Sequence, residues 1–300
     1  MPLLLICWNL RREAATVKIG VNVTNFTESL DVAVVAQKLE ELGFESLWLP
    51  EHIVVPVNTA SSYYGSSDGS IPEYMTYMVD PLISLARASA VTKRLRLGTS
   101  ICLITEHNPL LLAKRVSTLD HFSGGRFIFG IGTGWLREES EIMGADFDHR
   151  WSQAKESVLA MKELWINDEA EFHGKYYDFP LVRSYPKPYQ NPHPPIILGG
   201  TARNVFKRAV AWGDGWMPSR ATVDQIRSGR AVLDNLAATV ERDPESLEIT
   251  AFFQPADPGL INQLEEAGAA RVVLRLPPPS GKEALVQLEE FARLLPKHLL

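Results

Sequence analysis

Residues 108–134 read NPLLLAKRVSTLDHFSGGRFIFGIGTG, and this stretch decides the fold. Asn108 before Pro109 is the pattern of a helix N-cap followed by proline at the first helical position, and Gly124-Gly125 lies where that helix would end. The apolar run at 126–131 then predicts a short buried strand. A helix that leads through glycines into a strand is one unit of an α/β protein.

The same alternation runs along the whole chain. Short β-rich runs are followed by stretches in which apolar residues recur three and four positions apart, the spacing of a helix that packs on a sheet. Strict alternation favours a parallel sheet, and eight units favour closure into a TIM (β/α)8 barrel, because closure removes the sheet edges. A doubly wound open sheet is the alternative. Strands are predicted at 17–23, 45–49, 95–103, 126–131, 195–199, 214–217, 247–253 and 270–275, and helices at about 29–42, 81–92, 109–121, 150–167, 203–212, 222–241, 258–267 and 282–295.

The domain organisation follows from the same pattern. The chain has 300 residues and 45% apolar composition, enough for one large core, and no low-complexity linker divides it. We therefore predict a single barrel domain over 16–300, with long loops at the carboxyl ends of the strands. Residues 1–15 are predicted to be a loosely attached extension and not a secretory signal, because their apolar residues precede the arginines, whereas a signal has its positive charge first.

Charge and cysteine content limit the classes of function. The formal net charge is −6, with 30 basic and 36 acidic residues, so nucleic acid and anionic membranes are not expected partners. Cys7 and Cys102 support neither a disulfide framework nor a metal cluster, and a reducing cytoplasm is the expected location. The seven histidines show no repeated ligand spacing, so we predict no metal site.

The glycines that close the opening stretch resemble a nucleotide-binding loop but do not fit the dinucleotide fingerprint. That fingerprint requires G-x-G-x-x-G between a strand and a helix, whereas Gly130, Gly132 and Gly134 form G-x-G-x-G and lead into another loop. Two interpretations remain open. The glycines let the backbone turn at the barrel rim, or the bare amides near Thr133 and Gly134 admit a cofactor ring or phosphate.

Three other strand ends carry residues with chemical potential. Glu51 and His52 follow the second strand, where a histidine beside a carboxylate suits acid–base catalysis, although a surface pair without a role is the alternative. Gly98 inside the third strand indicates a bulge or a close backbone approach, or else only local twist. The run from Gly199 to Thr201 precedes a helix and suits an anion, although an N-cap at Thr201 explains the threonine equally well.

Taken together and in order, several stretches resemble a known family. They are ELGFESLWLPEH (41–52), DPLISLARASAVTKRLRLGTS (80–100), NPLLLAKRVSTLDHFSGGRFIFGIGTGWLREE (108–139), PPIILGGTA (194–202) and GDGWMP (213–218). This order is similar to that of the luciferase-like monooxygenase superfamily, and more narrowly to its coenzyme F420-dependent oxidoreductase branch. The resemblance covers roughly residues 17–218.

The resemblance implies a TIM barrel that binds a flavin or 5-deazaflavin at the carboxyl ends of its strands, commonly as a homodimer. Glu51 and His52 occupy the acidic and histidine positions of the branch, which implies that His52 handles a proton near the reactive C5 of the deazaflavin. A cis peptide bond is implied between Ser100 and Ile101, against which the ring stacks. The phosphate-bearing side chain is implied to lie at Thr133-Gly134 and at Gly199-Gly200-Thr201.

The chain departs from the branch directly after the G-T-G motif. Some sugar-phosphate dehydrogenases of the branch have a catalytic glutamate there, whereas this chain has Trp135, which we expect to form a wall of the pocket. Tyr63 and Tyr64, with Tyr74, suggest an aromatic substrate pocket, although they would equally pack loops onto the barrel. Glu138, Glu139 and Arg150 are candidates for structural pairing in the loop that follows.

The resemblance predicts an oxidoreductase that transfers a hydride between coenzyme F420 and a small organic substrate. One alternative is an FMN-dependent monooxygenase that uses reduced flavin and oxygen. A second alternative is a barrel that binds a cofactor without turnover.

Overall fold

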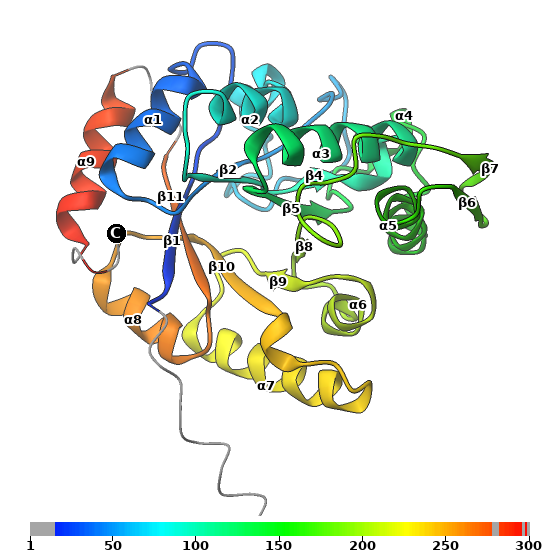
Figure 1. Cartoon of the computed structure of the whole chain (residues 1–300). Helices are drawn as coiled ribbons and strands as arrows, with labels where there is room; N and C mark the ends of the chain where they lie inside the picture. The colour runs from blue at the N-terminus through cyan, green and yellow to red at the C-terminus, as the bar shows by residue number, and fades with distance from the viewer. Residues whose placement is uncertain (1–15, 278–281, 296–297, 299–300) are drawn as a thin grey trace, which may run out of the picture.

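The structure is a computed structural model that describes residues 16–277, 282–295 and 298. The predicted extension at 1–15, which includes Cys7, lies outside the described residues. Within them, a closed parallel barrel is surrounded by helices (Figure 1). The predicted TIM barrel is therefore confirmed.

Eight strand positions form the barrel, each paired in parallel with its neighbours. The third position is divided into β3 and β4, and both segments pair with β5. The pairing of Leu97 with Phe127 closes the ring between β3 and β5, which excludes the open sheet. The strands are β1 (Lys18–Asn22), β2 (Ser46–Leu49), β3 (Arg96–Thr99), β4 (Cys102–Leu103), β5 (Phe127–Gly132), β8 (Ile196–Gly199), β9 (Gly215–Met217), β10 (Glu248–Gln254) and β11 (Arg271–Arg275).

The helices cover the outer face of the barrel (Figure 1). They are α1 (Val32–Leu42), α2 (Pro81–Ser89), α3 (Pro109–Ser123), α4 (Arg137–Ile142), α5 (Arg150–Ile166), α6 (Val205–Trp212), α7 (Val223–Thr239), α8 (Pro258–Glu266) and α9 (Glu283–Leu294), with 3₁₀ turns at η2 (Glu73–Tyr77), η3 (Ile104–Glu106) and η4 (Pro244–Ser246). The α3 boundaries follow the sequence signals. The Asn108 side chain accepts hydrogen bonds from the backbone N–H groups of Leu110 and Leu111, and Gly124 ends the helix at φ 66°.

Two details differ from the sequence predictions. Helix α6 begins at Val205, with Asn204 as its N-cap, so the predicted N-cap at Thr201 is wrong. Helix α4 was not predicted, because its six residues have no capping side chain and too few turns to show an apolar period. The excursion expected after α5 is an antiparallel hairpin of β6 (Ala170–His173) and β7 (Asp178–Val182), at the edge of the molecule (Figure 1).

The core has two parts. The larger cluster lies between the strands and the helices, and a smaller one inside the barrel contains Trp48, Ile128, Ile197, Met217 and Val273. Gly98 admits the Trp48 indole, because a Cβ at that glycine would lie 2.4 Å from the ring carbon Cε3. The close approach expected at Gly98 is thus a contact with a side chain. Among the described residues, no helix is both long and apolar enough to cross a bilayer.

Candidate functional site

A pocket of about 610 Å³ opens at the carboxyl ends of the strands. Its wall comes from the carboxyl ends of seven of the eight strand positions and from the loops that follow them, the place where barrels of this type carry their chemistry. Every residue predicted to act in catalysis or binding lines this pocket. These residues are Glu51, His52, Tyr63, Tyr64, Ser100, Ile101, Thr133, Gly134, Trp135, Gly199, Gly200 and Thr201.

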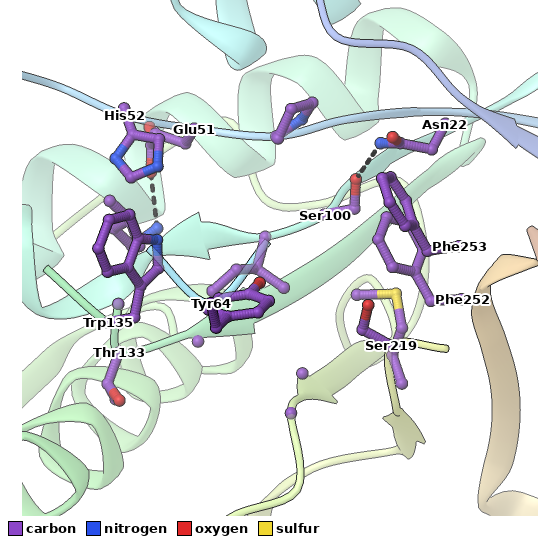
Figure 2. Close-up of a pocket in the computed structure, with 18 of the residues that line it drawn as sticks. Asn22, Glu51, His52, Tyr64, Ser100, Thr133, Trp135, Ser219, Phe252 and Phe253 are labelled. Carbon is purple, nitrogen blue, oxygen red and sulfur yellow. Dashed lines mark hydrogen bonds between the residues drawn. The ribbon is translucent and has the colours of Figure 1, made fainter. Parts of the chain in front are cut away.

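The wall between β3 and β4 is a backbone bulge. The Ser100-Ile101 peptide bond is cis, as the resemblance implied. Asn22 Nδ2 donates to Ser100 Oγ at 3.0 Å, which fixes the bulge to β1 (Figure 2). The Ile101 side chain lies against Gly132 and Gly199, where a Cβ would approach it to 2.0 and 2.7 Å. These glycines therefore leave room for Ile101, which in turn presents an apolar surface to the pocket.

His52 is held by a carboxylate that comes from a distant part of the chain. Its Nδ1 lies 2.6 Å from Glu139 Oε2, and Glu139 is only 1% exposed. Glu139 Oε1 also accepts the backbone N–H groups of Ile53 and Val54, at 2.7 and 3.3 Å. Because an ionised carboxylate only accepts hydrogen bonds, this contact places the proton on Nδ1 and leaves Nε2, which has no partner among the described residues, for a ligand.

Glu51 does not pair with His52, so the sequence interpretation of the two as an acid–base pair is wrong. Glu51 is buried, and its Oε2 accepts the backbone N–H of Leu103 at 2.6 Å. Both of its carboxylate oxygens lie 3.1 Å from His107 Nε2. Glu51 and His52 lie in the loop just after β2, where Glu51 contacts β4 and His107 beside η3 while His52 contacts Glu139 of α4. Glu51 thus joins β2 to β4 and η3.

Glu51, Cys102 and His107 also form a group whose potential metal-ligating atoms lie within 4.8 Å of one another. The sequence spacing gave no sign of this group, since β2 and η3 bring its members together. Burial and the neighbouring Glu51 raise the pKa of the Cys102 thiol well above its usual range, so the thiol holds its proton. Because Glu51 bonds to Leu103 and His107, the group has a structural role: it connects the loop after β2 to β4 and η3.

A third glutamate lies in the same buried region. Glu106 of η3 accepts a hydrogen bond from Ser140 Oγ at 2.7 Å, whereas its Oε2 has no partner within the described part of the chain. Burial and the charge of Glu139, with a smaller contribution from Glu51, raise the pKa of Glu106 to about 8. At neutral pH Glu106 is therefore mainly protonated beside the carboxylate that holds His52. No motif in the sequence marked this residue.

One side of the pocket is aromatic. The Trp135 ring lies 5.3 Å from that of Tyr63 and 5.9 Å from that of His52, centroid to centroid, and Tyr64 meets Trp135 edge-on at 6.3 Å (Figure 2). Edge-on and tilted contacts of this kind stabilise ring clusters. The rings pack the loop at 53–72 against Trp135, which follows β5, and they also line the pocket, so their contact with a substrate stays a prediction.

The loop that carries these tyrosines is fixed by helix α4. Glu138 Oε1 accepts the backbone N–H groups of Ala60 and Ser61, at 2.6 and 3.1 Å, and Glu139 holds the backbone at Ile53. The two glutamates thus have a structural role, as expected, but neither pairs with Arg150. That arginine lines the pocket instead.

The residues present fit a flavin or deazaflavin with a phosphate-bearing side chain. The Ile101 bulge offers an apolar surface to a planar ring, and Arg150, the first residue of α5, brings a positive charge to the wall of the pocket. Gly134 and Gly200 have φ of 70° and 92°, and a Cβ at Gly200 would meet nothing within 4 Å, so open space lies beside this backbone. Such a concave apolar wall with a few polar groups is typical of cofactor sites.

Comparisons with known proteins agree with this geometry. An uncharacterised protein of Mycobacterium tuberculosis is 34% identical over 267 residues, covering 88% of this chain and 93% of its own length. The F420-dependent glucose-6-phosphate dehydrogenase of Amycolatopsis mediterranei is 29% identical, covering 73% of this chain and 61% of the enzyme. The FMNH2-dependent dimethylsulfone monooxygenase of Pseudomonas putida is 32% identical, covering 60% of this chain and 56% of the enzyme.

A solved structure supports the fold. The monooxygenase RslO1 of Streptomyces bottropensis superposes with a TM-score of 0.73 at 21% identity, over 94% of this chain and all of the other. The family model described as luciferase-like monooxygenase matches residues 18–256, which extends from β1 to just beyond β10. With the closed barrel, the cis bulge and the pocket at the carboxyl ends of the strands, this match shows that the chain belongs to the luciferase-like monooxygenase family.

Proposed function

We propose that this protein is an F420-dependent oxidoreductase that transfers a hydride between the cofactor and a small organic substrate. The observation that carries the proposal is His52. It lines the pocket, its Nδ1 is engaged by Glu139, and its Nε2, which contacts none of the residues that the structure describes, can exchange a proton with a ligand. Hydride transfer to or from an alcohol or carbonyl carbon requires a proton to move at the substrate oxygen, and histidine suits that step near neutral pH.

Each part of the pocket then has a role. When bound, the cofactor supplies the hydride-accepting or hydride-donating carbon. The Ile101 bulge and Asn22–Ser100 orient the ring from one wall. Trp135 and the tyrosines of the 53–72 loop narrow the entrance and exclude water. Glu139 fixes the orientation and the tautomer of His52, and is therefore a positioning residue.

The length of the alignment supports F420 as the cofactor, whereas the FMNH2-dependent relative has the higher identity, 32% against 29%. The relative named for F420 aligns with 73% of this chain, a longer share than the 60% aligned with the FMNH2-dependent relative. The second candidate is an FMN-dependent monooxygenase, which the second of these relatives favours. The reactions are chemically distinct, because a 5-deazaflavin does not form the oxygen adduct that reduced flavin makes.

Parallel titrations of the purified protein with F420 and with FMN, followed by fluorescence quenching, test the proposal. We expect the tighter complex with F420. Tight binding of FMN with no binding of F420 contradicts the proposal and favours the monooxygenase. Incubating the preferred complex with a panel of alcohols then tests turnover through the absorbance of the oxidised cofactor. A cofactor that binds but is never reduced or oxidised supports the non-catalytic alternative.

A further inference from the structure

A second cleft, of about 390 Å³, lies between α6 and α7, which are neighbours on the outside of the barrel (Figure 1). This α6–α7 cleft shares only Thr201 and Ala202 with the main pocket at the carboxyl ends of the strands. Most of its wall is apolar and comes from Val205, Phe206, Trp216, Pro218, Ala221 and Val232. A dry cavity of about 150 Å³ already accommodates one benzene ring, so this cleft has room for a molecule with two fused rings.

The Trp216 indole, from β9, is held in the wall of the cleft by both helices. Its ring lies edge-on to that of Phe206 on α6, with 4.7 Å between the centroids. On α7, Gly229 makes room for the indole, because a Cβ there would lie 2.3 Å from its carbon Cζ3. Glycine inside a helix is less stable than alanine by about 1 kcal/mol, so this close approach is what Gly229 provides. The cleft therefore presents a fixed aromatic pair to a ligand.

The same indole connects the cleft to the main pocket. Trp216 Nε1 donates to the carbonyl oxygen of Gly200 at 2.8 Å, and the Gly200 N–H donates to the carbonyl oxygen of Met217 at 3.1 Å. Gly200 lines the main pocket, where the proposed function places the cofactor. In the segment that follows, the Asn204 side chain makes no capping hydrogen bond. Hydrogen bonds to β9 therefore hold the partition between the two cavities, and one of them comes from a residue that a ligand in the cleft contacts.

The charges of the α6–α7 cleft favour an anion. Arg203 is the basic residue of its lining and Asp224 the acidic one, and both are exposed. Asp224 is already paired, because its Oδ1 accepts a hydrogen bond from Arg227 Nη1 at 2.7 Å. Arg203 has no ion-pair partner among the residues that the structure describes. A carboxylate is thus attracted by one cation and meets no unpaired acid, whereas an amine gains no such partner.

We propose that the α6–α7 cleft binds a planar aromatic carboxylate, and that this ligand strengthens cofactor binding in the main pocket. Its rings pack on Trp216 and Phe206, and its carboxylate lies at Arg203. The inference goes beyond the proposed function, because this ligand is neither the cofactor nor the substrate. A ligand that packs on the indole stabilises the hydrogen bond from Trp216 to Gly200, and with it the backbone that lines the main pocket. Linkage requires that bound cofactor strengthens binding of the aromatic carboxylate by the same factor.

Three naphthalene derivatives of similar size test the site, namely anionic naphthoate, neutral naphthamide and cationic naphthylmethylamine. Their affinities for the full chain are measured by isothermal titration calorimetry near neutral pH. We expect the carboxylate to bind about 5-fold more tightly than the amide, the upper end of what one exposed ion pair contributes, and the amine to bind most weakly. Arg203→Gln should abolish the preference for the carboxylate, whereas Arg203→Lys should retain it.

Val232→Trp and Lys207→Gln separate the cleft from other sites. Val232 on α7 is 40% exposed, so a larger side chain there fills the cleft without crowding the core, and should abolish binding of all three compounds. Lys207→Gln is the matched control for charge, because Lys207 lies on α6 outside the lining, and it should leave the affinities unchanged. No binding, no preference for the carboxylate over the amide, or binding that survives Val232→Trp overturns the site. Circular dichroism spectra identify any variant that fails to fold.

The coupling is measured with the cofactor that the parallel titrations identify. We expect saturating naphthoate to raise cofactor affinity by at least about 5-fold, the lower end of typical coupling between sites. Trp216→Phe keeps an aromatic ring in the cleft but removes the donor to Gly200, so it should bind naphthoate and lose this increase. An unchanged cofactor affinity in the wild type overturns the coupling. A decrease that persists in Val232→Trp shows instead that naphthoate competes in the main pocket, and overturns the whole inference.

The outcomes separate this inference from the proposed function. Failure to bind F420 contradicts the proposed function, whereas the naphthalene series needs no cofactor and still tests the cleft. If neither F420 nor FMN binds, amide hydrogen exchange at 200–204 measures the coupling. Naphthoate should then slow the exchange in the wild type and not in Trp216→Phe, because only the wild type has the hydrogen bond to Gly200. Equal exchange with and without naphthoate in the wild type overturns the coupling.

Discussion

Charged side chains are paired differently at the two ends of the barrel. At the amino ends of the strands, the side chain of Arg271 is fully buried and bonds to Glu45 through Nε and Nη2, at 2.9 and 2.8 Å, and to Glu248 through Nη1 at 3.1 Å. At the carboxyl ends, Arg150 has no carboxylate partner among the described residues, and a buried donor is left over. The charge of Arg271 is neutralised within the protein, whereas that of Arg150 is left for a ligand.

The glutamates at the two ends show the same difference. Burial opposes ionisation of Glu248, but Arg271 and Lys18 lower its pKa to about 2. Burial also acts on Glu106 at the opposite end, where the neighbouring charges come from Glu139 and Glu51, and its pKa rises to about 8. The sign of the neighbouring charges, and not burial alone, therefore decides which carboxylate is charged at neutral pH. Charged groups that are paired within the protein stabilise the fold, whereas charged groups without a protein partner are available for chemistry.

The largest expected effect comes from the functional end. His52→Ala removes the proton-handling group, and we expect turnover to fall by about 10²–10⁴-fold while the free energy of unfolding changes little. Steady-state rates with the preferred cofactor, together with denaturant unfolding, measure both quantities. An unchanged rate contradicts the role of His52. A large loss of stability would instead break the division between the two ends.

Arg271→Met should have the opposite profile. It leaves the half-buried carboxylate of Glu45 without its bidentate partner and leaves Glu248 with Lys18 alone, so we expect a loss of about 3–5 kcal/mol in the free energy of unfolding at pH 7. Cofactor affinity of the remaining folded protein should stay the same. The double variant Arg271→Met/Glu45→Gln should recover part of the stability, because it removes one unpaired charge. Full stability in the single variant would show that the amino-end cluster is dispensable.

Glu139→Gln tests the positioning of His52. The amide keeps the shape of the side chain but presents a donor to Nδ1, so the proton should move to Nε2 and turnover should fall by about 10–100-fold with cofactor affinity unchanged. Histidine ¹⁵N chemical shifts report which ring nitrogen carries the proton, and a purely structural role would not change them. Glu138→Gln is the matched control, because Glu138 holds only the loop backbone. An unaltered His52 tautomer in Glu139→Gln would contradict the assignment.

The smallest expected effect is the pH dependence caused by Glu106. Its folded pKa of about 8 lies above the ordinary 4.5, so the folded state binds the extra proton between these values and stability falls as pH rises through that range. Above about pH 8 this contribution is constant. Glu106→Gln should flatten the curve and stabilise the protein at pH 8 by about 1–2 kcal/mol. Denaturant unfolding from pH 5 to pH 9 measures the difference, and identical slopes would refute the shift.

Much of the fold could be predicted because it depends on local signals. Alternating strand and helix patterns located all eight barrel strands, and the caps of α3 at Asn108 and Gly124 were correct. The split at Ser100-Ile101 was expected from the resemblance and not from any propensity. Helix α4 was missed, since a six-residue helix without a capping side chain leaves no pattern to detect.

The candidate site was only partly predictable, for a different physical reason. Residues at strand ends were found because a barrel gathers all of them at one rim. Their partners were not, because Glu139 lies 87 positions from His52 and reaches it only through the tertiary fold. Glu51, the adjacent carboxylate, was the wrong choice, since its oxygens already bond to Leu103 and His107. The sequence does not show, for the same reason, that Arg150 and Arg208 have no carboxylate partner among the described residues. Only the packing shows which acidic residues already pair with other side chains.

The contacts of α4 have a consequence for engineering this barrel. Glu138 and Glu139 anchor the backbone of the 53–61 segment, and one of them also holds His52. The aromatic loop and α4 therefore form one transplantable module with two sequence-distant halves. A loop exchanged alone from a relative with another substrate would lose its anchor and leave the histidine misaligned. Exchange of 53–79 together with 135–142 is the smallest graft that carries its own support.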